Sequence, residues 1–359
     1  MVGVGGLINL DTLVLTQEHI GRLLEVIGPH EVMCRVIDRL EYGMTELGLG
    51  RRRNSPPRSG FLRATPGDGV IENMPHYEPG HDMTLKNISY IPHNRERFAL
   101  PTVLGSLYRV SGDTGVLTAV ADAQLITAMR TGAASAIASK ILARVNSSTV
   151  GIVGAGAQSV TQLHGISTVY GIENVLVFDI DAANAESFAD RVAFLGLHVE
   201  VATLFEIMTH ADIICTATSV PVGEGPVLPD VSHLPHLHIN TIGSDEAGKT
   251  ELPVGLLRRA FVCVDHLEQA LAEGDSQQLV SNQIGASLPE LCAAPQLAKQ
   301  VRDGLTVFDS TGFAFEDHLA LDVFLEMAQE LGLGEKLPIM NYSGDLLNPY
   351  SSIIDCGMS

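Results

Sequence analysis

The segment Gly151-Ile152-Val153-Gly154-Ala155-Gly156-Ala157-Gln158-Ser159 carries the most information about the fold of this chain. It joins a short apolar run, residues 148–153, to a helix-like segment, residues 158–169. A second apolar run, residues 175–178, follows and ends in Asp179. A strand, a glycine-rich turn, a helix, a second strand and an acid, in this order, are typical of a dinucleotide-binding βαβ unit.

The positions of this turn have distinct physical roles. Gly154 permits the tight turn, and Gly156 lets the backbone approach a pyrophosphate. The helix that starts near Ala157 and Gln158 presents unpaired N–H groups and the positive end of its dipole to that anion. Ser159 replaces the third glycine of the pattern, so we expect slightly looser packing between this helix and the sheet.

The acid after the second apolar run indicates which cofactor is bound. Asp179 lies 25 residues after Gly154, where it would accept hydrogen bonds from the ribose hydroxyls of an adenosine. Asp181 adds a second negative charge, and no arginine follows nearby in the sequence. A 2′-phosphate would be repelled at this position, so the sequence favours NAD over NADP.

The bulk composition is that of a globular protein. The chain has 359 residues, of which 45% are hydrophobic and 18% charged, so its length favours two domains. Its formal charge of −20 repels nucleic acid and anionic membrane surfaces, which excludes both as expected partners. A site for a carboxylate would need its own local cations.

The five cysteines, Cys34, Cys215, Cys263, Cys292 and Cys356, are scattered and include no C-x-x-C pair. This pattern predicts reduced thiols in a cytoplasmic protein and no zinc site. Cys215 and Cys263 close apolar runs and are expected to be buried. The N-terminus has no basic segment before its apolar residues, so we expect no signal peptide. The longest low-charge stretch, residues 125–139, contains Arg130 and is too short to span a bilayer.

The pattern of apolar residues changes along the chain. Residues 16–47 predict two amphipathic helices separated by Gly28-Pro29. Residues 69–74, 83–91, 102–110 and 116–120 predict consecutive strands and therefore an antiparallel meander. An alanine-rich helix is expected at 123–144. Strands and helices then alternate, with strands at 150–153, 175–178, 199–202, 212–217, 238–242, 261–264 and 306–308.

This alternation predicts an α/β protein with a doubly wound, parallel sheet of the Rossmann type. Residues 314–331 predict a final helix, and the tail after it is expected to pack back on the first part of the chain. We therefore predict an NAD-binding domain at residues 124–314. A second, α+β domain is built from residues 1–123 and 315–359.

Three cations are candidates for a carboxylate site. Arg130 lies among small and apolar residues, so it is either paired internally with an acid such as Asp122 or Glu72 or clamps a substrate carboxylate. A lysine within a strand, such as Lys86, and an arginine in a loop, such as Arg58, are usually solvated. A glutamate at the end of a strand, such as Glu72, is also usually exposed.

Asp245 is the candidate acid–base group. It follows the apolar run 237–242, and ligands of open α/β sheets bind beyond the carboxyl ends of the strands. A carboxylate beside a nicotinamide would exchange protons with a substrate amine. The alternative is a turn or helix cap after Gly243. His233, His236 and His238 have no spacing that fits a metal site, so we expect them to pack or cap.

Taken together, six segments resemble the ornithine cyclodeaminase/mu-crystallin family, and within it most closely the lysine cyclodeaminases. The resemblance covers nearly the whole chain. The segments are Ile71-Glu72-Asn73-Met74-Pro75, the strand around Lys86, residues 128–134, Gly154-Ala155-Gly156-Ala157-Gln158, Gly248-Lys249-Thr250-Glu251-Leu252 and residues 307–314.

The resemblance implies roles for individual residues. A substrate carboxylate would be held by Arg58, Lys86 and Arg130, with Arg63 as the competitor for the place of Arg58. Glu72 and Asp245 would be the catalytic acids. Further cofactor contacts are implied at Thr218, Ser219 and Ser310. The segment Glu273-Gly274-Asp275 departs from the family, which usually has glutamate at the position of Asp275, so its role stays open.

The resemblance also implies the chemistry. NAD would take a hydride from the α-carbon of a diamino acid, Asp245 would accept a proton from the α-amine, and the distal amine would close a ring with loss of ammonia. The hydride then returns, so NAD is not consumed. L-lysine would give L-pipecolate. The resemblance further implies a homodimer, formed through the sheet of the first domain, and a small-molecule diamino acid as the ligand.

Three other functions stay open at this point. One is cyclisation of L-ornithine to L-proline. Another is a net oxidoreductase, such as a ketimine reductase or an enzyme like alanine dehydrogenase. The last is a ligand-binding or structural protein of the mu-crystallin type without catalysis. The presence of Glu72, Lys86, Arg130 and Asp245 together argues against this last function.

Overall fold

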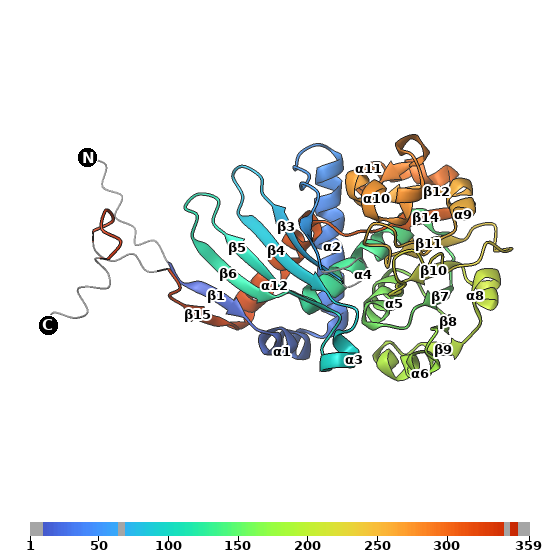
Figure 1. The fold of residues 1–359 in the computed structure, drawn as a ribbon, viewed down its shortest axis with the longest axis horizontal. Helices are drawn as coiled ribbons and strands as arrows, with labels where there is room; N and C mark the ends of the chain where they lie inside the picture. Colours follow the sequence, from blue (N-terminus) through green and yellow to red (C-terminus); the bar gives the residue numbers. More distant parts are fainter. Residues whose placement is uncertain (1–9, 64–68, 341–344, 351–359) are drawn as a thin grey trace.

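The computed structural model describes residues 10–63, 69–340 and 345–350. These residues form a seven-stranded and an eight-stranded β-sheet, each with helices packed against it (Figure 1). None of the helices in these ranges combines the length and the hydrophobicity needed to cross a lipid bilayer.

The seven-stranded sheet contains strands from both ends of the described chain. Its order is β15 (Glu335–Leu337), β1 (Thr12–Leu15), β6 (Leu117–Asp122), β5 (Val103–Val110), β4 (Met83–Tyr90), β3 (Val70–His76) and β2 (Ser59–Leu62). The pairs from β2 to β6 are antiparallel, which confirms the predicted meander. β1 pairs with β6 in parallel and with β15 antiparallel. The start of the tail therefore returns to this sheet, whereas residues 341–344 and 351–359 lie outside the described residues.

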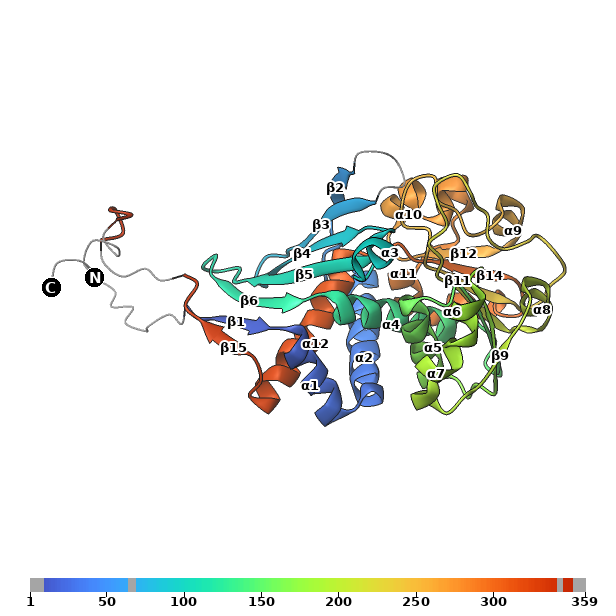
Figure 2. The ribbon, with the colours of Figure 1, turned by 60° about the horizontal axis from the view of Figure 1, so that its bottom comes forward.

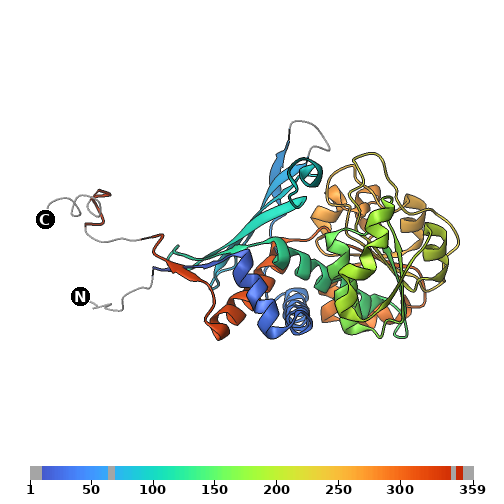
Figure 3. The same ribbon diagram turned by 90° about the horizontal axis from the view of Figure 1, so that it is seen from below.

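Helices cover one face of this sheet (Figures 2 and 3). α1 (Gln17–Ile27) and α2 (Pro29–Gly48) are the two predicted amphipathic helices, and Gly28 separates them with φ +92°. α12 (Ala314–Leu331) packs against β3 and β4, and the short α3 (Asn94–Phe98) follows β4. Side chains of a strand alternate between faces, so Lys86 and its cross-strand neighbour Leu107 share the helix-covered face and are fully buried.

α4 (Gln124–Leu142) is almost entirely buried and connects the two sheets. It packs against α2 and, most extensively, against α5 (Ala157–Val169). Small residues permit this approach, because a Cβ on Gly132 would lie 2.2 Å from the carbonyl oxygen of Thr161. The alanine-rich composition therefore fits a helix with close neighbours on all sides.

The eight-stranded sheet is entirely parallel, as predicted. Its order is β13 (Ala286–Ser287), β12 (Phe261–Val264), β14 (Thr306–Asp309), β11 (His238–Thr241), β10 (Ile213–Thr216), β7 (Thr149–Val153), β8 (Asn174–Phe178) and β9 (His198–Val201). The chain starts at β7, runs outward to β9 and then continues on the other side from β10. Such a reversal of strand order marks the crevice in which dinucleotides bind.

Helices and single turns connect these strands. Besides α5 they are α6 (Ala182–Glu186), α7 (Phe188–Arg191), α8 (Leu204–His210), α9 (Val254–Arg259), α10 (Leu267–Glu273), α11 (Leu288–Ala293) and the 3₁₀ turns η1 (Ala193–Leu195), η2 (Asp275–Gln278), η3 (Ser281–Gln283) and η4 (Pro295–Gln300). Ser159 of α5 is fully buried, and its hydroxyl donates to the carbonyl of Gly154. The residue that replaces the third glycine therefore closes the turn.

The described cysteines are all free thiols. Cys215 and Cys263 are buried, as predicted, whereas Cys34 and Cys292 are half-buried. Burial raises the pKa of the Cys215 thiol to about 12, so it is a packing residue rather than a nucleophile. Cys356 lies outside the described residues.

Candidate active site

The glycine-rich turn has the geometry that a dinucleotide requires. Gly154 has φ +86°, and a Cβ there would lie 2.7 Å from the carbonyl oxygen of Ala217. Gly156 and Ala157 are exposed at the start of α5, and a Cβ on Gly156 would meet no atom within 4 Å. Gln158 donates from Nε2 to the carbonyl of Ala128, 3.0 Å away, and so ties α5 to α4. The exposed backbone at the helix start fits a pyrophosphate.

Asp179 lies beside this turn, as expected. Its Oδ2 accepts from the backbone N–H of Ala155 at 2.7 Å, and its Oδ1 from that of Asp181 at 2.8 Å. Asp181 caps α6 by accepting from the N–H of Ala183 at 3.0 Å. Arg191 reaches the same turn and donates to the carbonyl of Ala155 at 2.7 Å. An arginine is therefore near in space, although none is near in sequence.

The other predicted cofactor contacts differ in exposure. Thr218 is half-buried and donates its hydroxyl to Glu251 at 2.7 Å, and Ser219 is exposed. Ser310 is buried, and its hydroxyl donates to Asp265 at 3.1 Å. All three follow the carboxyl ends of strands in the parallel sheet, which is the edge where a ligand of this fold binds.

Arg130 and Lys86 meet in a buried cluster. Arg130 donates from Nε to Asp317 at 3.1 Å and from Nη1 to Glu316 at 2.9 Å. The Nζ atom of Lys86 lies 2.6 Å from the other oxygen of Asp317. The predicted internal partners of Arg130, Asp122 and Glu72, were wrong, because its acids come from the first turn of α12. Neither cation is solvated.

Burial changes the protonation of Lys86. Its side chain is completely inaccessible, and this desolvation lowers the pKa of the ammonium group to about 8, against the stabilising charge of Asp317. Arg130 lowers this pKa further by repulsion. The expectation of a solvated strand lysine was therefore wrong, and the residue is a buried cation that needs anionic partners.

Arg58 converges on three acidic residues. Its Nε lies 2.6 Å from Glu273 and 3.3 Å from Glu72, and its Nη2 donates to the backbone carbonyl of Asp245 at 2.9 Å. The side chain is only 8% exposed, so the expectation of a solubilising loop arginine was wrong. Arg63 is exposed just after β2. The structure therefore brings Arg58 to the acidic residues.

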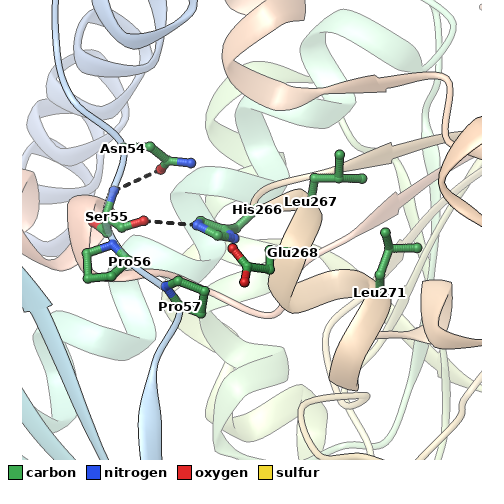
Figure 4. Close-up of a pocket in the computed structure, with 8 residues that line it drawn as sticks. All are labelled: Asn54, Ser55, Pro56, Pro57, His266, Leu267, Glu268 and Leu271. Carbon is green, nitrogen blue, oxygen red and sulfur yellow. Dashed lines mark hydrogen bonds between the residues drawn. The ribbon is translucent and has the colours of Figure 1, made fainter.

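The loop before Arg58 is anchored to α10. Nε2 of His266 lies 3.0 Å from the carbonyl oxygen of Ser55, and the backbone N–H of Arg58 donates to Oε1 of Gln269 at 3.0 Å. A surface groove runs between this loop and α10, and none of the predicted site residues lines it (Figure 4). The lining residues are Asn54, Ser55, Pro56, Pro57, His266, Leu267, Glu268 and Leu271. The contacts with His266 and Gln269 fix the backbone of the loop that carries Arg58.

Glu72 and Glu273 are two carboxyl groups with raised pKa values. Burial raises the pKa of Glu72 to about 7, Arg58 opposes this shift, and the charges of Glu273 and Asp245 add to it. Burial also raises the pKa of Glu273, again against Arg58. A carboxyl group that titrates near neutral pH can both accept and donate protons.

Asp245 lies beyond the carboxyl end of β11, as predicted. Its side chain is 37% exposed, and Oδ1 accepts from the Nζ atom of the buried Lys249 at 2.7 Å. Nζ of Lys249 also lies 4.7 Å from the ring centre of Tyr90, at the end of β4. Asp245 is thus more accessible than Arg58, Lys86 or Arg130, so a bound molecule can reach its carboxylate.

The two acids of the segment 273–275, Glu273 and Asp275, have different roles. Asp275 is fully buried and accepts from the backbone N–H groups of Glu251 and Leu252, both at 3.0 Å. It therefore holds the loop after Asp245 and does not reach the cations. Glu273, two residues earlier, contacts Arg58.

The three histidines of the segment 233–238 have separate partners. His236 contacts Asp212 at 2.8 Å, and His238 contacts Thr306 at 2.9 Å inside the protein. His233 contacts a backbone carbonyl. Within the described ranges, no group of three His, Cys, Asp or Glu side chains is arranged for a metal ion.

No site role was predicted for four residues, Glu273, Lys249, Glu316 and Asp317, although Lys249 and Glu273 lie in segments that the family resemblance singled out. The adjacent acids Glu316 and Asp317 at the start of a helix rich in apolar residues were the available signal. They resemble an ordinary acidic first turn, which favours the helix dipole, so their contact with Arg130 was not apparent.

Comparison with known proteins identifies the family. A model of the ornithine cyclodeaminase/mu-crystallin family matches residues 17–331. The L-lysine cyclodeaminase of Streptomyces rapamycinicus is 52% identical over 342 residues, which are 95% of this chain and 100% of that protein.

Two solved structures are similar over nearly the whole chain. One is a lysine cyclodeaminase, studied for recognition of L-lysine, L-ornithine and L-2,4-diaminobutyric acid, with a TM-score of 0.93, 52% identity and coverage of 95% and 99% of the two chains. The other is an archaeal alanine dehydrogenase dimer with bound NAD, with a TM-score of 0.80, 31% identity and coverage of 92% and 100%. The chain belongs to the ornithine cyclodeaminase/mu-crystallin family.

Proposed function

We propose that this protein is an NAD-dependent cyclodeaminase that converts L-lysine into L-pipecolate and ammonia. Three buried cations, Arg58, Lys86 and Arg130, carry this proposal: the charges of Arg58 and Arg130 both act on Lys86. Glu72 is within electrostatic reach of Arg58, Lys86 and Asp245. The cations suit an α-carboxylate, and the acids suit the amines. The 52% identity to an L-lysine cyclodeaminase supports lysine as the substrate.

The chain also fits the cofactor that this reaction needs. Bound NAD would supply a hydride acceptor that later returns the hydride, so no net oxidation occurs. Gly154, Gly156, Ala157 and Gln158 would hold the pyrophosphate, and Asp179 and Asp181 would face the adenosine ribose. Thr218, Ser219 and Ser310 would complete the cofactor site from the neighbouring strand ends.

The protein residues would position the substrate and move its protons. Arg130 and Lys86 hold the carboxylate, which places the α-carbon beside the cofactor site. Asp245 accepts the proton of the α-ammonium group, since only a neutral amine readily loses hydride from the adjacent carbon. Glu72, with its pKa near 7, exchanges the protons that ring closure and loss of ammonia require.

We assign these tasks to two parts of the chain. Residues 1–123 and 315–359 bind the substrate and form the dimer, and residues 124–314 bind the cofactor. Arg58, Glu72 and Lys86 support the first assignment, because they lie in the seven-stranded sheet or the loop before it. Residues 124–314 would add Arg130 of α4 and Asp245, which follows β11, to the substrate site.

The decisive experiment separates cyclisation from net oxidation or reduction. The purified protein is incubated with NAD and L-lysine, and ammonia, L-pipecolate and NADH are measured. We expect equal amounts of ammonia and L-pipecolate with no accumulation of NADH. Net NADH formation would instead indicate a dehydrogenase, and binding without ammonia would indicate a non-catalytic member of the family.

L-ornithine is the second candidate substrate, and it would give L-proline. The similar lysine cyclodeaminase has been studied with L-ornithine as well as L-lysine, which favours testing both. The same ammonia assay with each amino acid ranks them by kcat/KM. The same residues would bind the α-carboxylate of both amino acids. We therefore expect any difference in kcat/KM between L-lysine and L-ornithine to arise from the position of the distal amine.

We further propose a homodimer formed through the open face of the seven-stranded sheet. Val14, Val120, Tyr108, Leu85 and Pro75 lie in register across five strands on the face away from α12, and all are half-buried in one chain. An apolar row of this kind is suited to a self-complementary interface. The alanine dehydrogenase relative is itself a dimer.

A charge in this row is expected to separate the subunits. Leu85→Asp places an uncompensated carboxylate at the centre of the interface, so the mass in solution should fall from that of a dimer to that of a monomer. Light scattering during size-exclusion chromatography measures this mass. Val26→Asp on α1, where the residue is 51% exposed, is the control and should stay dimeric. A monomeric wild-type protein would contradict the proposal.

The thiols support a cytoplasmic location, which we also propose. Cys215 and Cys263 are buried and unpaired, and Cys34 and Cys292 are free as well. Free cysteines of this kind are usual in a reducing compartment and uncommon in secreted proteins.

A further inference from the structure

The cluster that would bind the substrate carboxylate already contains two carboxyl groups of its own. Asp317 contacts Nζ of Lys86 at 2.6 Å with one oxygen and Nε of Arg130 at 3.1 Å with the other. Glu316 contacts Nη1 of Arg130 at 2.9 Å through Oε2. Two cations thus face two acids before any ligand arrives.

Glu316 differs from Asp317 in the partners of its oxygens. Both side chains are fully buried. Each oxygen of Asp317 faces a cation, with Oδ2 2.6 Å from Nζ of Lys86, whereas Oε1 of Glu316 has no hydrogen-bond partner within the described part of the chain. An ionised carboxylate with one bare oxygen in the protein interior is costly, because nothing replaces the water that it loses. A neutral carboxyl group with the proton on Oε1 reduces this cost.

The charge of the cluster leads to the same conclusion. If both acids were ionised, Lys86 and Arg130 would be fully compensated, and a third carboxylate would gain little from binding there. Among these four side chains, a neutral Glu316 leaves one net positive charge, and the nearby Asp265 accepts from donors of its own, Ser310, Thr311 and the backbone N–H of Gly312. The hydrogen bonds of Arg130 to described residues use Nε and Nη1, which leaves Nη2 for a further acceptor.

We propose that Glu316 is a neutral carboxyl group that recognises the substrate, donating a hydrogen bond from its Oε1–H to the α-carboxylate that Arg130 and Lys86 bind. This inference rests on the proposed function, since it names a further recognition group for the same site. The unpartnered Oε1 then gains an acceptor in the complex, and the substrate carboxylate gains a donor without a competing negative charge.

The groups around Glu316 support its neutrality. They are Arg130 from α4, Lys86 from β4, Asp265 directly after β12, and Asp317 from α12 itself. Burial raises the pKa of Glu316 to about 8, Arg130 and Lys86 oppose this shift, and Asp265 and Asp317 add to it. A raised pKa means that the neutral form is present at pH 7 and is lost as the pH rises through 8. Carboxylate binding should weaken over the same range.

The test compares the binding of L-pipecolate, the proposed product, at pH 7 and pH 9. Calorimetry gives the dissociation constant for the NAD-loaded wild type, Glu316→Gln and Glu316→Leu. Gln keeps a neutral donor, so its affinity at pH 7 should be within about threefold of the wild type, whereas Leu should bind about 10- to 100-fold more weakly. Burial lowers the pKa of Lys86 to about 8, and this residue is present in all three proteins, so part of the pH dependence is common to them. The rise in Kd between the two pH values should therefore be about tenfold larger in the wild type than in Glu316→Gln.

Piperidine, which lacks the carboxylate, is the control ligand, and its affinity should not respond to the substitutions at position 316. Equal pH dependence in the wild type and Glu316→Gln would overturn the inference, as would a Gln variant that binds L-pipecolate as weakly as the Leu variant. Thermal unfolding of each variant shows whether it is folded. If Glu316→Leu does not fold, the comparison of the wild type with Glu316→Gln is sufficient to test the inference.

The ammonia assay separates this inference from the proposed function. Ammonia release from L-lysine without any dependence of carboxylate binding on Glu316 would reject the inference alone. The expected dependence of L-pipecolate binding, without ammonia release, would reject the cyclodeaminase function and keep the inference. No binding of L-pipecolate by the wild type, together with no ammonia release from L-lysine, would reject both.

Discussion

Replacing Asp245 by Asn is expected to lower the turnover of L-lysine by about 10²- to 10⁴-fold, the usual effect of removing a general acid–base group. The amide side chain introduced by this substitution cannot accept the proton of the α-ammonium group, so the amine stays charged and hydride loss is suppressed. The amide oxygen can still accept from Lys249, which in the wild type donates to Asp245 at 2.7 Å, so the loop should keep its position. Initial rates of ammonia release give kcat and KM.

The pattern of kinetic constants distinguishes this role from a structural one. KM should change by less than about threefold, because the carboxylate is held by other residues. Glu268→Gln is the control, since Glu268 is an exposed acid of nearby α10 that lines the groove in Figure 4. An Asp245→Asn variant with unchanged turnover would remove the assigned role.

Replacing Arg130 by Leu is expected to affect both activity and stability. Arg130 donates to the two buried carboxyl groups of Glu316 and Asp317, and breaking a buried ion pair costs about 3–5 kcal/mol. Such a loss is a large part of the ~5–15 kcal/mol that stabilises a typical domain. The substrate carboxylate would lose a buried, charged contact, so kcat/KM should fall by about 10²- to 10⁴-fold. Thermal unfolding and ammonia release measure the two effects.

Arg130→Lys separates these effects. The ammonium group keeps the charge and should recover most of the stability, but it lacks the planar fork that reaches Glu316, Asp317 and a ligand at once. We therefore expect kcat/KM to stay low in this variant. A Leu variant that is folded and has wild-type kcat/KM would show that Arg130 does not bind the substrate.

The regular elements were largely readable from the sequence. The helices at 17–27 and 29–48 follow a pattern of apolar residues with helical spacing, and the parallel strands follow short apolar runs. Strands β1, β2, β13 and β15 were not predicted. Each has two to four residues, and a segment this short shows no reliable alternation, so only pairing with a neighbour makes it a strand.

The candidate site was only partly readable. The resemblance to the family pointed to Arg58, Lys86, Arg130, Glu72 and Asp245, whereas the local sequence favoured solvated positions for Arg58, Lys86 and Glu72. Local composition describes neighbours along the chain, and these side chains are buried by distant segments. Burial was therefore the property that local patterns predicted least well.

By itself, the amino-acid sequence determined the glycine turn, the order of strands and helices and the placement of Asp179 and Asp245 at strand ends. These features depend on residues close in the chain, where backbone geometry and side-chain spacing act directly. The tertiary structure alone decided which charges meet. Arg130 and Asp317 are 187 residues apart, and Arg58 and Glu273 are 215 apart. Which acid pairs with a buried cation depends on how whole sheets and helices pack. A local sequence pattern does not contain this information.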